Sequence, residues 1–394
     1  MFREFPALKI FSALAAVSLA LVLFGVLGSC SLGGRGAGLK RHDLFSISLG
    51  TLPGELDWFY RDGFRIAGTA DIQERDGLIY ISGGNAGKVM VFNSYGDLVT
   101  YVYDPARNPA PASGEEGTGV GSVSSWPFRD IGHIAAYGGG FLVEDGVEKE
   151  RRVEEGEFGA LYDRVVLRFD RDGEYQGHLG KEGLGGSPFP YIDSLEVRKD
   201  GGIVVTCRVP GAWMSYWFDQ NGRPVSTVRI EHDRLPGLKT GETAAVYSVR
   251  PDPVEWALHI RMDVYRDEDG AREPEARLYT LNLSTLEYSE PLVLSYTSPL
   301  EETGIPSVPL EYLGTAASGA HLLLSTEGPE IYRLILMDPR GRIVQNRRLK
   351  VEASATIYRR FRLQPDGLLT GIFFGPEKAS VAWWRVDKLL KNVK

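Results

Sequence analysis

The chain has 394 residues, a formal net charge of −8, and 47 Gly and 22 Pro but 2 Cys. The acidic balance, with no basic stripe, argues against nucleic acid or an anionic lipid surface as a partner. Many short apolar runs separated by turn residues favour an all-β protein with one large core.

The first element is an apolar stretch from Ile10 to Ser29, preceded by the basic residues Arg3 and Lys9. A basic start, an apolar middle and small residues before a cleavage site are the three parts of a secretory signal. The 20 residues from Ile10 to Ser29 would also suffice to span a bilayer as an uncleaved helix, which is the alternative. Either interpretation places the rest of the chain outside the cytoplasm.

The four residues that end at Cys30, Leu-Gly-Ser-Cys, resemble the lipobox of bacterial lipoproteins. The resemblance implies that cleavage leaves Cys30 as a lipid-modified, palmitate-bearing N-terminus that attaches the chain to the cell envelope. Ser31 stands where some bacteria place an acidic residue for retention in the inner membrane, so the outer membrane is the expected location.

A recurring pair of hairpins fills the rest of the chain. Six apolar runs end in a turn led by Asp or Asn, and these turns begin at Asn93, Asp170, Asp219, Asn282, Asp338 and Asp387. A second hairpin precedes each of them, commonly with an Asp-Gly turn but with a degenerate Asp252-Pro253 in the fourth unit. These residues favour tight turns because Asp and Asn bond their own backbone and glycine accepts positive φ. Six units of four strands predict a β-propeller.

Glycine-rich linkers join the units. The segment 177–189 ends in Ser-Pro-Phe and leads into a strand that begins near Ile192, and 119–131 is a looser copy. This arrangement resembles the NHL-type six-bladed propeller, which implies six four-stranded antiparallel blades over nearly all of the mature chain. Strands follow these glycines, whereas a dinucleotide-binding motif would need a helix there.

The last unit has three good strands, so we expect the fourth to come from the start of the domain. Residues 44–49 alternate apolar side chains with serines and are predicted to pair antiparallel with 381–387, which closes the ring. The predicted divisions are a signal peptide (1–29), a flexible tether (30–43) and a six-bladed propeller (44–394).

Ring closure also distinguishes two faces. The turns within each hairpin are short and lie on one face, whereas the longer connections gather on the other, which we call the long-loop face. Long loops on one rim commonly carry binding residues. The closing strand begins at the short-turn face, so we expect the tether to arrive there and the long-loop face to point away from the membrane.

Three carboxylates are candidates for a metal site. Asp71, Asp130 and Asp193 begin successive inner strands and could converge at the mouth of the channel. Propellers resembling lactonases hold a divalent metal there, so the alternative function is a calcium-dependent, lactonase-like hydrolase. The same residues could instead cap strands or bond linker amides. No Glu or Asn at matching positions of the last three units completes a cage, so no cofactor is expected.

Aromatic residues indicate a binding surface. Trp58, Tyr60 and Trp213 map to expected loops of the long-loop face, Trp213 within 208–214, and are predicted to contact a partner. Phe128 and Phe189 are expected to pack beneath the linkers. His133 and His259 are expected on strands, as satisfied structural histidines.

No nucleophile-elbow motif appears in the sequence. We therefore expect a lipid-anchored protein whose propeller is a non-enzymatic scaffold for a protein or glycan partner in the envelope.

Overall fold

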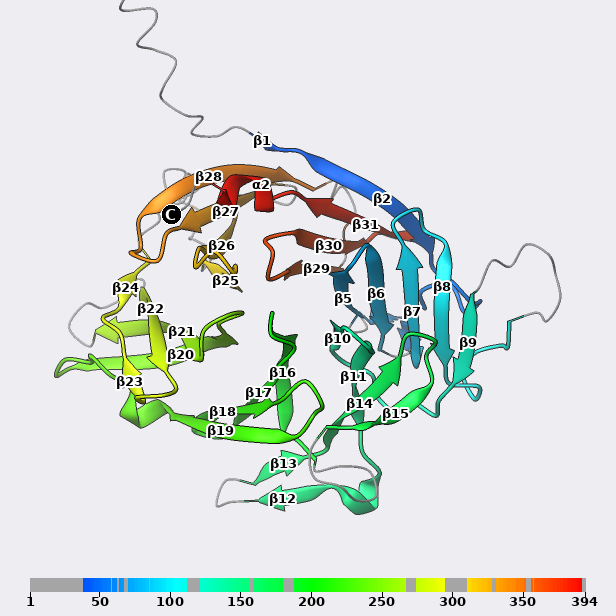
Figure 1. Cartoon of the computed structure of the whole chain (residues 1–394), viewed down its shortest axis with the longest axis horizontal. Helices are drawn as coiled ribbons and strands as arrows, with labels where there is room; N and C mark the ends of the chain where they lie inside the picture. Colours follow the sequence, from blue (N-terminus) through cyan, green and yellow to red (C-terminus); the bar gives the residue numbers. More distant parts are fainter. Residues whose placement is uncertain are drawn as a thin grey trace, which may run out of the picture.

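The computed structural model of the protein describes residues 38–391 except for 58, 62–63, 67–69, 85, 112–120, 156–158, 180–187, 267–273, 295–309, 328–330, 352–355 and 357. Within this part of the chain, six antiparallel sheets stand around a central channel as the blades of a propeller (Figure 1). The predicted all-β, six-bladed architecture is confirmed. Among the described helices, none has the length and apolar character needed to cross a bilayer. The predicted signal peptide and Cys30 lie outside the described residues.

The first three blades follow one another along the chain. From the channel outward, blade 1 consists of β5 (Ala70–Arg75), β6 (Leu78–Gly83), β7 (Lys88–Asn93) and β8 (Leu98–Tyr103), with β9 (Ser122–Ser125) parallel at its edge. Blade 2 consists of β10 (Ile134–Tyr137), β11 (Gly140–Gly146), β14 (Arg164–Asp170) and β15 (Tyr175–His178). Blade 3 consists of β16 (Tyr191–Val197), β17 (Ile203–Val209), β18 (Ala212–Phe218) and β19 (Pro224–Glu231).

The remaining blades repeat this order with one irregular outer edge. Blade 4 consists of β20 (Glu242–Pro251), β21 (Ala257–Arg266), β22 (Glu275–Asn282) and the short strands β23 (Glu287–Tyr288) and β24 (Leu292–Val293), which both pair with β22. Blade 5 consists of β25 (Glu311–Thr315), β26 (His321–Thr326), β27 (Ile331–Met337) and β28 (Ile343–Lys350). Blade 6 consists of β29 (Tyr358–Leu363), β30 (Leu369–Phe374), β31 (Lys378–Trp384) and β2 (Arg41–Ser48).

Four further strands lie outside the blades and form two small hairpins, β3 (Phe59–Arg61) with β4 (Phe64–Ile66) and β12 (Val153–Glu155) with β13 (Ala160–Tyr162). The second hairpin projects from the rim of blade 2 (Figure 1). A single helix, α2 (Asp387–Leu390), and two short 3-10 turns complete the described elements.

The beginning of the domain closes the ring, as the sequence predicts. Strand β2 runs antiparallel to β31, with Arg41 opposite Trp384 and Ser48 opposite Lys378. The pairing starts before residue 44, so part of the predicted tether is strand. The apolar alternation in 44–49 did not predict that the strand begins earlier, because the residue that packs there is the charged Arg41. Its guanidinium lies 5.1 Å from the centroid of the Phe373 ring.

The closing strand begins at the short-turn end of blade 6, as expected, because Arg41 lies opposite Trp384 at the end of β31. Residues 38 and 39 form β1 (Gly38–Leu39), which pairs parallel with Arg348 and Leu349 of β28 in blade 5. The N-terminal segment therefore contacts two neighbouring blades, first blade 5 and then blade 6 (Figure 1). The contact with blade 5 was not predicted from the sequence.

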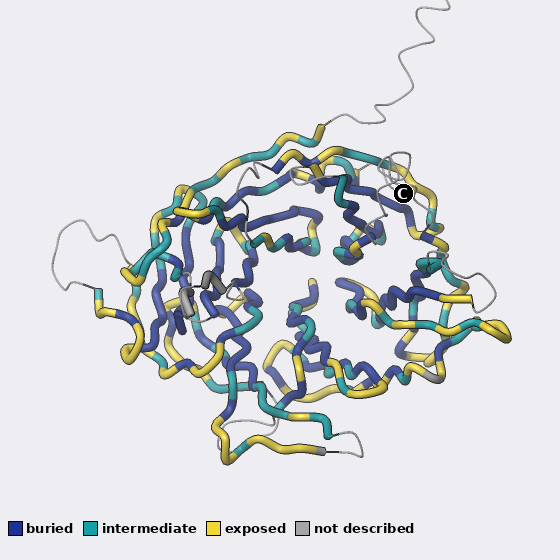
Figure 2. Tube along the Cα trace, turned by 180° about the vertical axis from the view of Figure 1, so that it is seen from behind, coloured by how far each residue is buried: buried dark blue, intermediate teal, exposed yellow. Residues whose placement is uncertain are grey.

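The core lies between adjacent blades, and both faces of the middle strands are buried (Figure 2). Between blades 5 and 6, Trp384 is fully buried and packs against Phe361 and Phe373 at ring centroid distances of 5.7 and 5.9 Å. Burial of such a side chain contributes about 2–3 kcal/mol. Cys207 is also fully buried, as a strand residue of blade 3.

The repeated turns have the predicted chemistry. In blade 2, Asp170 Oδ1 accepts hydrogen bonds from the backbone N–H groups of Asp172 and Glu174 at 3.1 and 2.9 Å. Gly96 ends the corresponding turn of blade 1 with φ of +91°, and a Cβ there would lie 2.8 Å from that of Phe45 in β2. The turn glycine therefore also permits close contact with the closing strand.

Candidate functional site

A cavity of about 560 Å³ lies at the mouth of the central channel, and we call it the channel-mouth cavity. It opens on the long-loop face, because its walls come from the residues at which the inner strands begin. Every blade contributes to the wall, with at least Asp71, His133, Asp193, Arg250, Tyr312 and Arg360 from blades 1 to 6 in turn. The site is therefore held by strands of the whole ring.

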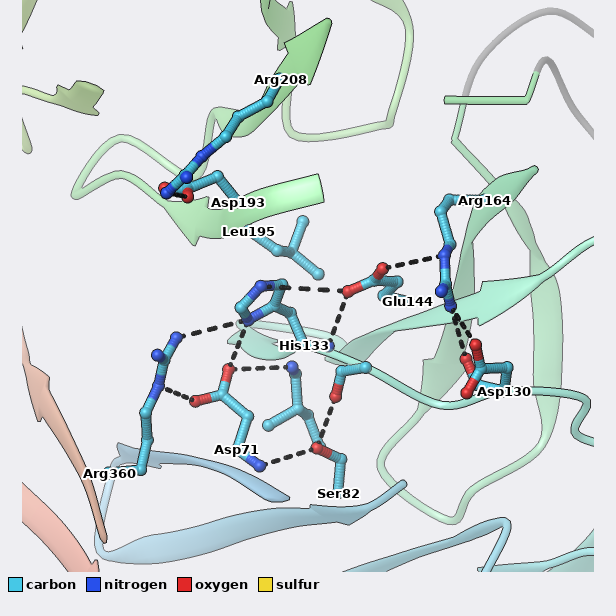
Figure 3. Close-up of polar contacts among 12 residues, drawn as sticks. Asp71, Ser82, Asp130, His133, Glu144, Arg164, Asp193, Leu195, Arg208 and Arg360 are labelled. Atoms are coloured by element: carbon cyan, nitrogen blue, oxygen red, sulfur yellow. Dashed lines mark hydrogen bonds and ion pairs between the residues drawn. The ribbon is translucent and has the colours of Figure 1, made fainter. Parts of the chain in front are cut away.

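Asp71 is the best-connected carboxylate of the cavity (Figure 3). Its side chain is 5 % exposed; Oδ1 accepts a hydrogen bond from Arg360 Nε at 3.1 Å, and Oδ2 lies 3.2 Å from His133 Nδ1. Burial alone would raise the pKa of Asp71, but Arg360 and His133 hold it well below the usual range. The ionised carboxylate thus joins blades 1, 2 and 6.

A second acidic group lies on the other side of His133. Glu144 Oε2 accepts the backbone N–H of His133 at 2.9 Å and lies 4.0 Å from its Nε2. Arg164 lies near three carboxylates: Nη1 is 2.7 Å from Asp130 Oδ2, and Nε is 3.7 Å from Glu144 Oε1 and 3.6 Å from Asp163 Oδ1. Burial raises the pKa of Glu144, and His133 and Arg164 oppose this shift.

Blade 3 supplies another ion pair. Arg208 Nη2 donates to Asp193 Oδ1 (Figure 3), and the Arg208 guanidinium lies 4.6 Å from the centroid of the Trp213 ring. The Asp193 side chain is 9 % exposed, whereas that of Arg208 is 51 % exposed. In blade 4, Arg250 Nη1 lies 3.0 Å from Glu196 Oε1. The arginines of the wall are therefore oriented by carboxylates.

The three aspartates proposed as metal ligands all line the cavity, but each has a guanidinium partner: Arg360 for Asp71, Arg164 for Asp130 and Arg208 for Asp193. These cations occupy carboxylate lone pairs and would repel a bound metal ion. Within the described residues, no group of three or more His, Cys, Asp or Glu side chains is arranged to hold a metal. The ion pairs thus support a structural role for these aspartates.

The structure corrects one of the three predicted interface aromatics. The side chain of Trp213 is buried, with the residue 2 % exposed, and it belongs to the core cluster between blades 3 and 4. Residues expected to form a loop are instead a tight hairpin, in which Val209 pairs with Ala212, and this turns Trp213 towards the neighbouring blade. Tyr60 lies in β3, and its side chain and Trp58 are outside the described part of the structure.

The sequence analysis did not select the exposed aromatics of the cavity as contact residues. Tyr191 and Tyr247 line it and are 60 % and 44 % exposed, whereas Phe128 and Phe189 are buried, as expected. Tyr191 precedes Asp193 at the start of an inner strand. Comparison of the first residues of the inner strands across the six repeats would have revealed this concentration of charged and aromatic side chains.

The geometry favours binding over proton transfer. An Asp–His pair such as Asp71–His133 can act as a general base. Here the outer ring nitrogen of His133 lies beside the Glu144 carboxylate, so a substrate would have to approach along a second acidic group. The paired charges instead offer fixed hydrogen-bond donors and acceptors to a polar ligand.

The comparison with solved structures finds chains whose names indicate different activities. They include the β-propeller domain of the Trilobed protease from Pyrococcus furiosus, with a TM-score of 0.40, 10% identity and coverage of 80% of this chain and 83% of that one. A polysaccharide lyase of family PL25, an ulvan lyase, has a TM-score of 0.38, 13% identity and coverage of 88% and 83%. A putative gluconolactonase has a TM-score of 0.36, 13% identity and coverage of 89% and 93%.

Similarity at this level concerns the fold alone. No protein-family model matches the sequence, and no curated protein is detectably similar to it.

Proposed function

We propose that the protein is a lipid-anchored component of the bacterial cell envelope, with the outer membrane as its location, whose propeller binds a protein or glycan partner without catalysing a reaction. The observation that carries the proposal is the channel-mouth cavity, to which all six blades contribute. Its polar groups are held by ion pairs on strands, which gives a binding site little conformational entropy to lose.

The anchor is proposed from the lipobox-like residues before Cys30. Metabolic labelling with palmitate and fractionation of cells expressing Cys30→Ala will test it. We expect the variant to lose both the label and its membrane association. Cys207→Ala is the matched control, because Cys207 is the other cysteine of the chain and should keep both properties. A Cys30→Ala protein that still carries the label would contradict the proposal.

The binding role can be tested by crosslinking in intact cells followed by affinity capture of the anchored protein. Arg208→Ala changes an exposed residue of the cavity and should abolish capture of a specific partner. Arg385→Ala is the control, because Arg385 is 44 % exposed and follows β31 at the short-turn face. Identical captured proteins and glycans for the wild type and both variants would rule out the long-loop face as the binding surface.

A calcium-dependent hydrolase of the lactonase kind is the second candidate. The observation that favours it is the convergence of Asp71, Asp130 and Asp193 on one cavity. Metal analysis of the purified protein and its melting temperature with and without calcium decide the question, since a ligand that binds the native state raises the melting temperature. We expect no bound calcium and no shift.

A further inference from the structure

The channel-mouth cavity carries many charges of both signs, and most of them are paired. Its described lining includes five carboxylate side chains and four guanidinium groups. Each of these guanidinium groups has a carboxylate within 4.0 Å: Arg360 with Asp71, Arg164 with Asp130, Arg208 with Asp193 and Arg250 with Glu196. A ligand that enters the cavity therefore meets ion pairs and not a field of one sign.

This pairing disfavours a charged ligand. An anion would have to compete with the carboxylates already bound to the arginines, and a cation would have to compete with the arginines. A hydroxyl group avoids both costs, because it can donate to a carboxylate and accept from the adjacent guanidinium. Hydrogen bonds to charged groups are about twice as strong as those between neutral groups. Paired charges thus suit a neutral ligand with many hydroxyl groups.

Exposed aromatic rings stand among these ion pairs. Tyr191 is the cross-strand partner of Arg208 at the entrance to blade 3, and both residues are exposed. In the adjacent blade 4, the Tyr247 ring is held by the buried guanidinium of Arg261, 4.1 Å from the ring centroid. The negative face of an aromatic ring attracts polarised C–H groups, such as those on the face of a sugar ring.

The cavity has a floor. Below it, the buried Arg362 of blade 6 donates from Nη2 to the backbone carbonyl of Leu195 in blade 3 and so crosses the channel. Only about 30 Å³ of space remains at that level, near Glu196 and Thr315. The cavity volume of about 560 Å³ falls in the range that takes a ligand of a few rings. A chain end or short branch fits such a blind site better than a chain that passes through the ring.

We propose that the channel-mouth cavity binds the end of a neutral saccharide, with a sugar ring stacked on Tyr191 and its hydroxyl groups bonded to the Asp193–Arg208 and Asp71–Arg360 pairs. This inference rests on the proposed function, because it names the ligand class for the same face. Tyr191 is a specificity-determining residue in this arrangement, since it supplies the ring surface.

Calorimetric titration of the purified full chain with matched pairs of oligosaccharides tests the inference. One pair is a galactose trimer and a galacturonate trimer, and the other is an N-acetylglucosamine trimer and its deacetylated, cationic form. We expect the neutral member of at least one pair to bind about tenfold more tightly than the charged member. Its affinity should change less than about twofold when the salt concentration is raised, because no net charge is neutralised.

Variants then locate the site. Tyr191→Ala should weaken binding by at least about tenfold, whereas Tyr191→Phe should retain it because the ring remains. Tyr191 is 60 % exposed, so both variants should fold normally. Tyr95→Ala is the control, because Tyr95 is 86 % exposed on the β7–β8 turn of the opposite face and should not affect affinity.

Three results would overturn the inference: no binding by any neutral trimer, tighter binding by the charged members, or full affinity in Tyr191→Ala. The capture experiment separates this outcome from failure of the proposed function. If Arg208→Ala abolishes partner capture while no saccharide binds, the long-loop face is a binding surface for another class of partner. If neither capture nor saccharide binding depends on this face, both proposals are wrong.

Discussion

Two aspartate–histidine pairs of the ring have the same chemistry and different surroundings. In the channel-mouth cavity, Asp71 Oδ2 lies 3.2 Å from His133 Nδ1. In blade 4, Asp252 Oδ2 lies 2.9 Å from His259 Nε2. The side chain of His133 is 17 % exposed and that of His259 is 5 % exposed. One pair therefore borders a cavity, and the other is enclosed.

The enclosed pair stabilises the first turn of blade 4, which lacks the Asp-Gly sequence. Blade 4 has Asp252-Pro253 where blades 1, 3 and 6 have Asp-Gly. Asp252 Oδ1 accepts the backbone N–H groups of Val254 and Glu255 at 2.8 and 2.7 Å. His259 completes the arrangement through Thr280 Oγ1, 3.1 Å from Nδ1. Local bonds thus satisfy this pair. Asp71 instead pairs with Arg360 of blade 6, the neighbour of blade 1 in the closed ring, so it links blades and borders ligand space.

The largest expected effect comes from breaking the link that Asp71 makes between blades 6, 1 and 2. Asp71→Ala leaves Arg360 and His133 without their carboxylate partner, and we expect a loss of about 3 kcal/mol in the free energy of unfolding. Urea denaturation of the purified protein measures it. Asp130→Ala is the control, because its carboxylate is 59 % exposed and should cost less than about 1 kcal/mol. Equal losses for the two variants would contradict the distinct role of Asp71.

Breaking the enclosed pair should cost somewhat less. His259→Ala removes the ring nitrogens that pair with Asp252 Oδ2 and Thr280 Oγ1, in surroundings largely shielded from water. Unsatisfied buried polar groups cost about 1–3 kcal/mol, so we expect a loss near 2 kcal/mol by the same denaturation measurement. Saccharide binding should be unchanged, because His259 lies outside the cavity. A His259→Ala protein with wild-type stability but weakened saccharide binding would contradict the purely structural role of this pair.

The neighbour of His259 should make the protein sensitive to acid. Burial and the adjacent His259 lower the pKa of His321 from 6.5 to about 3. The unfolded chain therefore takes up a proton first as the pH falls. The stability contributed by neutral His321 is complete above about pH 6.5, decreases by about 2 kcal/mol at pH 5 and continues to fall towards pH 3.

Denaturation curves at pH 7 and pH 5 test this difference. In His321→Gln the loss of stability between the two pH values should be smaller by about 2 kcal/mol. His232→Gln changes a histidine at the periphery of blade 3 and serves as the control, with the wild-type slope expected. An unchanged slope in His321→Gln would show that other groups cause the acid sensitivity.

The smallest expected change in stability is at the cavity pair. His133→Gln keeps a polar side chain beside Asp71, while Arg360 continues to hold the carboxylate, so we expect a loss below about 1 kcal/mol. Neutral saccharide binding should nevertheless weaken, because the wall between Asp71 and Glu144 is altered. Calorimetry alongside denaturation separates the two effects. Unaltered binding would confine the ligand to the Arg208 side of the cavity.

The repeat made the fold predictable, whereas the side-chain contacts between blades could not be predicted. Turn residues such as Asp170 and Gly96 mark the blades locally, and burial of Phe128 and Phe189 follows from their place under linkers. The pairing of Asp71 with Arg360 joins residues 289 positions apart and depends on how the ring closes. The three aspartates were expected at the channel mouth because they stand near the starts of inner strands, and they do line the cavity. The sequence did not indicate which arginines pair with them.

Trp213 shows where a local pattern misleads. The sequence around it contains Pro and Gly and was interpreted as a loop, but a two-residue turn suffices to connect β17 and β18. Because side chains alternate between the two faces of a strand, a shift of one residue in its register decides whether a side chain faces solvent or a neighbouring blade. An aromatic near a turn is thus a weak indicator of an interface until the strand ends are known.

The entry of the chain along two blades has a mechanical consequence. Tension applied at the N-terminus acts first on β1 beside blade 5 and then along β2, whose bonds to β31 run across the direction of the strand. A lengthwise pull loads these bonds together in shear, and does not open them one after another. A propeller attached through its first residues would thus resist a pulling force on the domain. If the force became large enough for β2 to slip from β31, blade 6 would lose its outer strand and the ring would open.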